Sequence, residues 1–127
     1  MRSFTLFFAI LSAATFGCAQ TISGGDAMFH SGGIGSCGRS YGDTDFVVSV
    51  DHATMAQFAG TETDPTRNPL CGRQMVITSP DNKAITVTVE DTCFICSTGS
   101  VDLTRGAFQL LAPLSAGIIH GISWTLI

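Results

Sequence analysis

The chain has 127 residues, enough for one domain with a modest hydrophobic core. It carries ten acidic and six basic residues, a formal net charge of −4 at pH 7. Nucleic acids and anionic membranes are therefore disfavoured as partners, because both carry dense negative charge. A neutral polysaccharide is compatible with this balance.

Residues 1–19 are predicted to be a secretory signal peptide. Arg2 precedes an apolar run over residues 4–16 that is too short to span a bilayer, and Gly17-Cys18-Ala19 provides the small residues that precede a cleavage point. A lipoprotein site at Cys18 is the alternative, which the bulky aromatic residue two positions earlier disfavours. Residues 20–127 are then one extracellular domain, with no membrane partner once the signal peptide is removed.

Four cysteines remain in this domain, and an even number in a small secreted domain indicates two disulfides. Three connectivities exist, of which we favour Cys37–Cys71 with Cys93–Cys96. A Cys-x-x-Cys pair is redox-active in some proteins, but Ser97-Thr98-Gly99-Ser100 does not continue as the helix that lowers a thiol pKa. Because Cys37 and Cys71 stand alone, no second paired cluster completes a zinc site, and we expect no metal.

In chain order, the first half of the domain predicts two strands and a helix. Residues 26–30 form a short strand, and the glycine-rich residues 32–38 must turn tightly. Residues 46–50 are rich in β-branched side chains and form a second strand. The aspartate that follows is predicted to cap a helix over residues 52–59. Residues 61–70 are polar, contain two prolines and are predicted to form a surface loop.

The second half predicts a hairpin, a helix and a final strand. Residues 74–78 are a predicted strand, and a Pro-Asp-Asn-Lys turn leads into a second strand over residues 85–90, which alternates apolar and polar side chains. Together they are predicted to form a hairpin. Thr104 is predicted to cap a helix over residues 105–111, and residues 118–127 alternate as the last strand. About six short strands with two short helices indicate a mainly β domain, folded as one closed barrel.

Two carboxylates flank the Cys93-x-x-Cys96 turn. Asp91 ends the alternating strand before the turn, and Asp102 lies between two apolar neighbours in a short strand after it. The structural alternatives are that Asp91 accepts backbone N–H groups of the turn and that Asp102 caps the next helix, a place for which Thr104 is better suited. We take both acids as candidate functional residues.

Several blocks occur in a fixed order along the chain: Gly35-Ser36-Cys37-Gly38, Asn68-Pro69-Leu70-Cys71-Gly72-Arg73, Val89-Glu90-Asp91-Thr92-Cys93-Phe94-Ile95-Cys96, Val101-Asp102-Leu103-Thr104, Ala107-Phe108-Gln109-Leu110-Leu111-Ala112-Pro113, and Gly117-Ile118-Ile119 with Trp124. In these blocks the chain resembles the double-psi β-barrel proteins of the expansin-like, RlpA-like superfamily, and in particular the small fungal single-barrel loosenins. The resemblance covers nearly the whole domain.

The resemblance implies a six-stranded barrel with a groove across one face. Asp102 matches the acid that related endoglucanases use and expansins retain, and Asp91 matches a second groove-side acid. Such proteins loosen plant or fungal wall polysaccharides without measurable hydrolysis, some bind chitin or peptidoglycan, and relatives include plant defence proteins and a protease inhibitor. Met28 and His30 stand where the family often has a threonine and a tyrosine.

Hydrolysis with inversion requires an acid and a base on either side of the glycosidic bond. Asp102 fits the acid, since its apolar neighbours favour the protonated form. The position of the endoglucanase base holds Met28, Phe29 and His30 and no carboxylate. We therefore expect no hydrolysis. Lytic transglycosylation, which can dispense with the base, is the enzymatic alternative.

Three aromatic side chains are candidates for ligand contact. Tyr41 and Trp124 could stack on a sugar ring, although Trp124 shares its face of the last strand with two aliphatic residues and fits the core as well. Phe94, at the tip of the cysteine turn, is either a lid over the turn or an exposed contact.

These observations predict a secreted, monomeric, non-hydrolytic protein that binds and loosens cell-wall polysaccharide, such as β-glucan, cellulose or chitin, without a cofactor. Its acid-like groups would be Asp102 and Asp91, and its binding residues His30, Tyr41, Asp91, Asp102 and Trp124. The alternative is a secreted protein-interaction module, either a protease inhibitor or an effector. In that case the loops of residues 61–70 and 94–100 would bind the partner.

Overall fold

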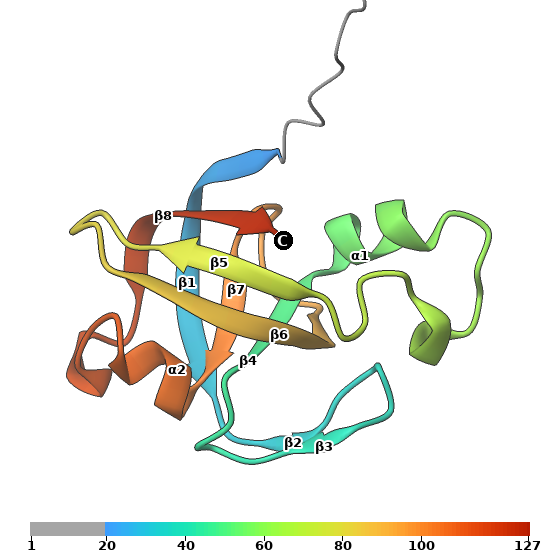
Figure 1. Ribbon diagram of the computed structural model, residues 1–127, viewed down its shortest axis with the longest axis horizontal. Coiled ribbons are helices and arrows are strands. Elements are labelled where there is room, and N and C mark those ends of the chain that lie inside the picture. The colour runs from blue at the N-terminus through green and yellow to red at the C-terminus, as the bar shows by residue number, and fades with distance from the viewer. Residues whose placement is uncertain (1–19) are drawn as a thin grey trace, which may run out of the picture.

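The structure of the protein is a computed structural model that describes residues 20–127. The predicted signal peptide, residues 1–19, lies outside the described residues. Six strands close into a barrel in the order β1-β7-β4-β6-β5-β8 (Figure 1). Their bounds are β1 Thr21–His30, β4 Val47–Asp51, β5 Gln74–Thr78, β6 Ala84–Cys93, β7 Val101–Thr104 and β8 Ile119–Leu126.

Two short helices and a small ribbon complete the domain. Helix α1 (His52–Ala59) and helix α2 (Arg105–Gln109) lie on opposite sides of the barrel in the view of Figure 1. The ribbon pairs β2 (Gly33–Ile34) with β3 (Ser40–Tyr41) and projects from one end of the barrel. The predicted mainly β fold with two short helices is confirmed.

Two of the barrel's pairings are parallel, and they determine which side chains meet. β1 runs parallel to β7, with Met28 opposite Asp102, and β4 runs parallel to β6, with Ser49 opposite Asp91. β4 also pairs antiparallel with β7, which places Ser49 opposite Asp102. Met28, Asp102, Ser49 and Asp91 therefore form one row across four neighbouring strands.

The barrel closes around side chains that alternate along the strands. In β6, Ile85, Val87 and Val89 are buried, as the alternation of this segment predicts. Phe108 from α2 and Leu70 from the loop after α1 are fully buried and complete the same core. Each such side chain contributes about 1.5–3 kcal/mol by leaving water.

Some predicted boundaries and one predicted cap are corrected. β1 begins at Thr21 rather than residue 26, because it pairs with β8 from Thr21 onward. Helix α2 ends at Gln109 rather than residue 111, and a separate 3-10 helix η2 (Leu114–Ala116) follows. Thr104 is fully buried and its hydroxyl donates to the Asp45 carbonyl, so its side chain does not cap α2.

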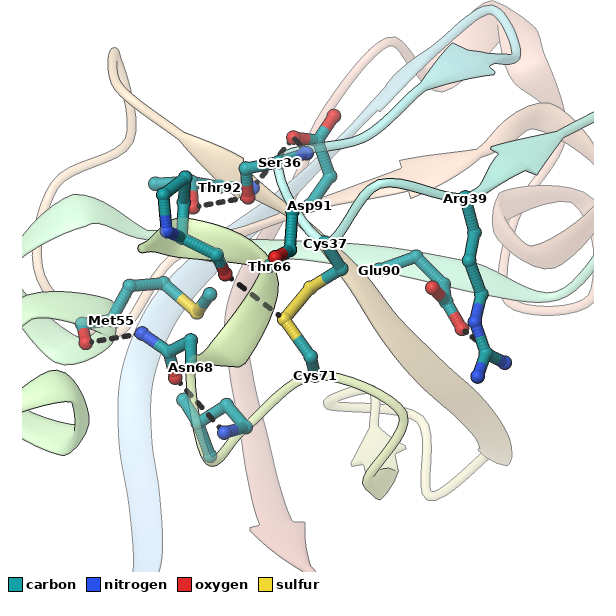
Figure 2. Close-up of a disulfide and its surroundings, with 12 residues drawn as sticks. Ser36, Cys37, Arg39, Met55, Thr66, Asn68, Cys71, Glu90, Asp91 and Thr92 are labelled. Carbon is teal, nitrogen blue, oxygen red and sulfur yellow. Dashed lines mark hydrogen bonds and ion pairs between the residues drawn. A yellow bond between two sulfur atoms is a disulfide. The ribbon is translucent and has the colours of Figure 1, made fainter. Parts of the chain in front are cut away.

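Both predicted disulfides are present. Cys37 and Cys71 have Cα atoms 5.6 Å apart, and those of Cys93 and Cys96 are 5.4 Å apart. Figure 2 shows that the first disulfide joins the loop of the β2–β3 ribbon to the segment after the 3-10 helix η1 (Pro65–Arg67). No helix within residues 20–127 is long and apolar enough to cross a membrane.

Asp51, the last residue of β4, is fully buried and caps helix α1 as predicted. Its carboxylate accepts the N–H and the hydroxyl of Thr54, each at 2.8 Å, and the N–H of Gly99 at 3.0 Å. Gly99 lies in the turn that precedes β7. Asp51 therefore fastens α1 to the turn that leads into the strand carrying Asp102.

Replacing Asp51 with alanine is expected to lower the free energy of unfolding by about 2–4 kcal/mol, because it removes a helix cap and leaves buried donors unpaired. Asp64 is the matched control, since it accepts the N–H and hydroxyl of Thr66 on the exposed turn η1. Asp64→Ala should cost far less. Urea unfolding followed by circular dichroism measures both variants. Equal losses would contradict the role assigned to Asp51.

Candidate functional site

A connected series of polar side chains runs from Asp102 to Asp91. His30 Nδ1 lies 3.0 Å from Asp102 Oδ1, and His30 Nε2 lies 2.6 Å from the Tyr41 hydroxyl. That hydroxyl donates to Asp91 Oδ2 at 3.0 Å. The four side chains come from β7, β1, β3 and β6, in that order. We call Asp102, His30, Tyr41 and Asp91 the polar chain.

Strand register sets the span of the polar chain. Asp102 and Asp91 flank Ser49 from the two sides of β4. Their backbones are therefore two strand spacings apart, about 10 Å. Because His30 and Tyr41 bond to each other and to the two acids, these side chains occupy the space between the carboxylates.

The β2–β3 ribbon positions Tyr41 between the two carboxylates of the polar chain. The loop between the two strands lies directly on β6, where the Cys37 N–H donates to the Glu90 carbonyl at 3.2 Å. A Cβ atom on Gly35 would lie 2.0 Å from that same carbonyl oxygen, so the close approach requires glycine. The glycine-rich stretch of the sequence therefore serves to seat Tyr41 beside His30.

Asp91 is held firmly at the other end of the polar chain. Its Oδ1 accepts the N–H of Ser36 at 2.9 Å and that of Thr92 at 2.8 Å, while Oδ2 accepts the Tyr41 hydroxyl. Figure 2 shows Ser36 next to the carboxylate and Thr92 beside Ser36. The structural role considered for Asp91, acceptance of backbone N–H groups at a strand end, is thus present, and it coexists with a place in the polar chain.

Asp102 is the less constrained carboxylate. Its Oδ1 lies 3.0 Å from His30 Nδ1, an ion pair when His30 is protonated, and neither of these two buried atoms has another hydrogen-bond partner. The Asp102 side chain is 17% exposed, compared with 25% for His30. Asp102 does not cap α2, whose N-cap position belongs to Thr104. Asp102 is therefore the acid that a ligand at this face would meet.

The protonation states within the polar chain follow from its geometry. Contact with Asp102 is the largest cause of a raised pKa of His30, against an opposing effect of burial, and the charges of Asp91 and Asp43 raise this pKa further. Burial, followed by the nearby Asp91 charge, raises the pKa of Tyr41 to about 12. Tyr41 therefore stays protonated at neutral pH. Its one proton goes to Asp91, so His30 Nε2–H must donate to the phenol oxygen.

The two predicted sugar-stacking residues do not present an open ring face. Trp124 is only 4% exposed, and its indole N–H donates to the Gly99 carbonyl at 3.1 Å. It alternates with Ile122 on the inward face of β8, so its ring belongs to the core. Tyr41 is 9% exposed and meets the His30 ring edge-on, with centroids 5.7 Å apart. Tyr41 contributes its hydroxyl to the site rather than a ring face.

Asp43 is a charged neighbour of the site that sequence analysis did not identify. Its Oδ1 accepts the Gly32 N–H at 2.6 Å, which holds the start of the ribbon, and its Oδ2 lies 4.0 Å from Arg105. Asp43 also acts on the charge of His30. The available signal was its position two residues after Tyr41, just beyond β3, where the chain passes the end of β1.

Phe94 is exposed and packs against helix α1. Its side chain is 73% exposed, and its ring packs on that of His52 with centroids 5.1 Å apart. Among residues 20–127, no three His, Cys, Asp or Glu side chains gather closely enough to hold a metal ion.

Comparison with known proteins links this fold to two kinds of protein. The chain is 29% identical to a papain inhibitor from Streptomyces mobaraensis over 116 residues, which cover 91% of this chain and 78% of the relative. The solved structure of a Streptomyces papain inhibitor superposes with a TM-score of 0.75 at 29% identity, covering 85% of this chain and 94% of the other. No family profile matches the chain.

The second kind is expansin. An expansin of Clavibacter michiganensis superposes with a TM-score of 0.66 at 28% identity, and a variant of that protein in complex with cellohexaose does so with a TM-score of 0.67 at 26% identity. Each match covers 85% of this chain but 50% of the expansin, so the chain spans about half the expansin's length.

A fungal elicitor, cerato-platanin, shares the fold alone, with a TM-score of 0.54 at 15% identity over 80% of this chain and 91% of that protein. These neighbours are all relatives of the double-psi β-barrel kind. The chain therefore has a fold that these solved structures share.

Asp102→Asn is expected to lower the pKa of His30, because it removes the largest cause of the rise. The folded-state pKa lies above the ordinary value of 6.5, so protonated His30 stabilises the fold fully below that pH. This stabilisation is lost as the pH rises through the folded-state pKa. Asp102→Asn should therefore destabilise the protein more at about pH 5 than at about pH 9.

NMR titration of the His30 ring protons measures this pKa directly. The control is Asp26→Asn, which removes the 2.8 Å contact between Asp26 and His120 and should leave His30 unchanged. A wild-type His30 that titrates at or below its ordinary value would contradict the assigned interaction.

Proposed function

We propose that the protein acts outside the cell as a loosenin-type protein, binding cell-wall polysaccharide such as cellulose, another β-glucan or chitin without cleaving it. The observation that carries this proposal is the polar chain, which links Asp102 to Asp91 at the half-buried surface of the barrel. The similarity to an expansin in complex with cellohexaose supports the ligand class. The two disulfides support an oxidising compartment.

Binding would exchange contacts between glycan chains for contacts with the polar chain. Asp102 offers its carboxyl oxygens to sugar hydroxyl groups, and His30 lies beside it with Nδ1 3.0 Å from Asp102 Oδ1. A charge-assisted hydrogen bond of this kind contributes about 1.5–3 kcal/mol. A few such bonds along one glycan compete with the hydrogen bonds that hold it to its neighbours, and no covalent bond needs to break.

The occupied space between the carboxylates supports binding without cleavage. An inverting hydrolase needs room for the sugar and a water molecule between its acid and its base. Here His30 and Tyr41 lie between Asp102 and Asp91, bonded to each other at 2.6 Å. Both oxygens of Asp91 already accept hydrogen bonds. For Asp91 to act as a base, Tyr41 would have to leave.

An open hollow of about 550 Å³ lies over β5 and β6, and Tyr41 is the member of the polar chain that lines it. Phe46, which is 49% exposed, lines this hollow and offers the ring that Tyr41 and Trp124 do not. The remaining lining side chains are mostly polar and include Arg39 and Gln74. Together these residues suit a hydroxyl-rich chain that stacks one sugar ring on Phe46.

Asp102→Ala is expected to weaken binding to insoluble cellulose or chitin about tenfold, because the main charged acceptor is lost. A pull-down of purified protein on each polymer measures the bound fraction, with Asp26→Asn as the control. Mass spectrometry of the supernatant should find no released oligosaccharides. A steady release of oligosaccharides, or unchanged binding by the alanine variant, would contradict the proposal.

A second candidate function is inhibition of a papain-like cysteine protease. The similarity to a papain inhibitor over 91% of this chain favours it. So does the exposed apolar pair Phe94 and Ile95 on the disulfide-closed turn, since binding loops of inhibitors need rigid apolar contacts. Residual papain activity in the presence of the purified protein tests this function.

A further inference from the structure

The Cys93–Cys96 turn carries the most exposed pair of neighbouring large apolar side chains in residues 20–127. Phe94 is 73% exposed and Ile95 is 86% exposed. Exposure of adjoining apolar side chains to water is unfavourable, and such side chains mark surfaces that another molecule covers. We call Phe94 and Ile95 the apolar tip.

The apolar tip is held rigidly. The Cys93–Cys96 disulfide closes a ring of four residues, and Cys93 itself is buried at the end of β6. The Phe94 ring rests on His52 of helix α1 at a centroid distance of 5.1 Å. A surface that is ordered before binding loses little conformational entropy when a partner covers it.

A hollow of about 260 Å³ lies beside the apolar tip. It is lined by helix α1, the loop after it and Phe94, with Met55, Ala56 and Pro65 among its apolar side chains. Asn68 fixes this loop to the helix, donating to the Met55 carbonyl at 2.9 Å (Figure 2). The two loops that the sequence names as alternative binding elements, residues 61–70 and 94–100, thus form one continuous surface.

We propose that the apolar tip enters the active-site cleft of a papain-class cysteine protease and that the adjacent hollow receives an apolar side chain from the rim of that cleft. This inference deepens the second candidate function and rests on it. A protein is favoured over a glycan as the partner, because the branched aliphatic Ile95 has no ring face on which a sugar could stack. Glu62 and Asp64 line the hollow, and although Arg67 lies 3.5 Å from Glu62, the two carboxylates leave a net negative charge that favours a rim carrying positive charge.

The geometry of the turn explains why the protein would inhibit such a protease and would not be cleaved as its substrate. Proteases bind substrates in an extended conformation, in which three residue steps span about 10 Å. The disulfide holds the Cα atoms of Cys93 and Cys96 at 5.4 Å. The tip can fill apolar subsites, but its backbone cannot straighten along the cleft to present a bond for cleavage.

The test measures the inhibition constant of the full secreted protein against papain, using a fluorogenic peptide substrate. Phe94→Ser and Ile95→Ser should each raise this constant about tenfold, because each removes an apolar side chain buried in the complex. Leu110→Ser is the matched control: Leu110 is 50% exposed and follows α2, on the opposite side of the barrel from α1 in Figure 1. Its inhibition constant should stay within about twofold of wild type.

The outcomes separate this inference from the function on which it rests. No inhibition by the wild-type protein would overturn both. Inhibition that Phe94→Ser and Ile95→Ser leave unchanged would keep the second candidate function and overturn the assignment of the apolar tip. Loss of cellulose or chitin binding in these variants, with papain inhibition intact, would assign the tip to the glycan site and also overturn the inference. Cleavage of the 93–96 turn by papain, seen by mass spectrometry, would do the same.

Discussion

The attachment of the β2–β3 ribbon to the end of β6 is the contact on which the rest of the site depends. Asp91 accepts the Ser36 N–H, and the Cys37 N–H donates to the backbone of the preceding residue of β6. This contact brings Tyr41 within hydrogen-bond distance of His30 and Cys37 within reach of Cys71. Without it, His30 and Asp102 would form an isolated pair on the barrel wall, and Asp91 would have no link to them.

The same strand end also supports the second surface. Beyond Asp91, the Thr92 hydroxyl bonds to that of Ser36 at 2.8 Å, and the cysteine turn follows at once. Ser36 and Thr92 both line the hollow beside the apolar tip. The polar chain and the apolar tip therefore adjoin each other, separated by one hydrogen-bonded pair.

The sequence predicts a structural feature well when residues close by in the chain determine that feature. The alternation of Ile85, Val87 and Val89 fixes their burial, and the aspartate before residues 52–59 caps that helix, because both effects act within a few residues. The alignment of Asp91 with Ser49 is not local. It follows from an irregularity between Val48 and Ser49, without which the regular register would place Ser49 opposite the residue before Asp91.

The candidate site residues also differ in whether local sequence predicts their roles. Asp91 was identified by its place at a strand end, and Asp102 and His30 chiefly by the family resemblance. The structure brings all three together with Tyr41. The hydroxyl role of Tyr41 depends on how the ribbon folds back. Alternation alone allowed Trp124 either role, and the partner of its indole N–H is the carbonyl of Gly99, 25 residues away in the sequence.

The charges around His30 bear on which class of glycan would fit the proposed binding face. Three carboxylates, those of Asp102, Asp91 and Asp43, raise the pKa of His30, while Tyr41 stays uncharged. These three carboxylates outnumber the one side chain of the cluster, His30, that can carry a positive charge. The guanidinium of Arg105, 4.0 Å from Asp43 and directed over the Phe29 ring, is the nearest further compensation that the contacts show. An anionic polysaccharide would meet repulsion from this cluster, whereas a neutral chain brings hydroxyl donors that the carboxylates can accept. The acidic balance of the whole chain acts in the same direction.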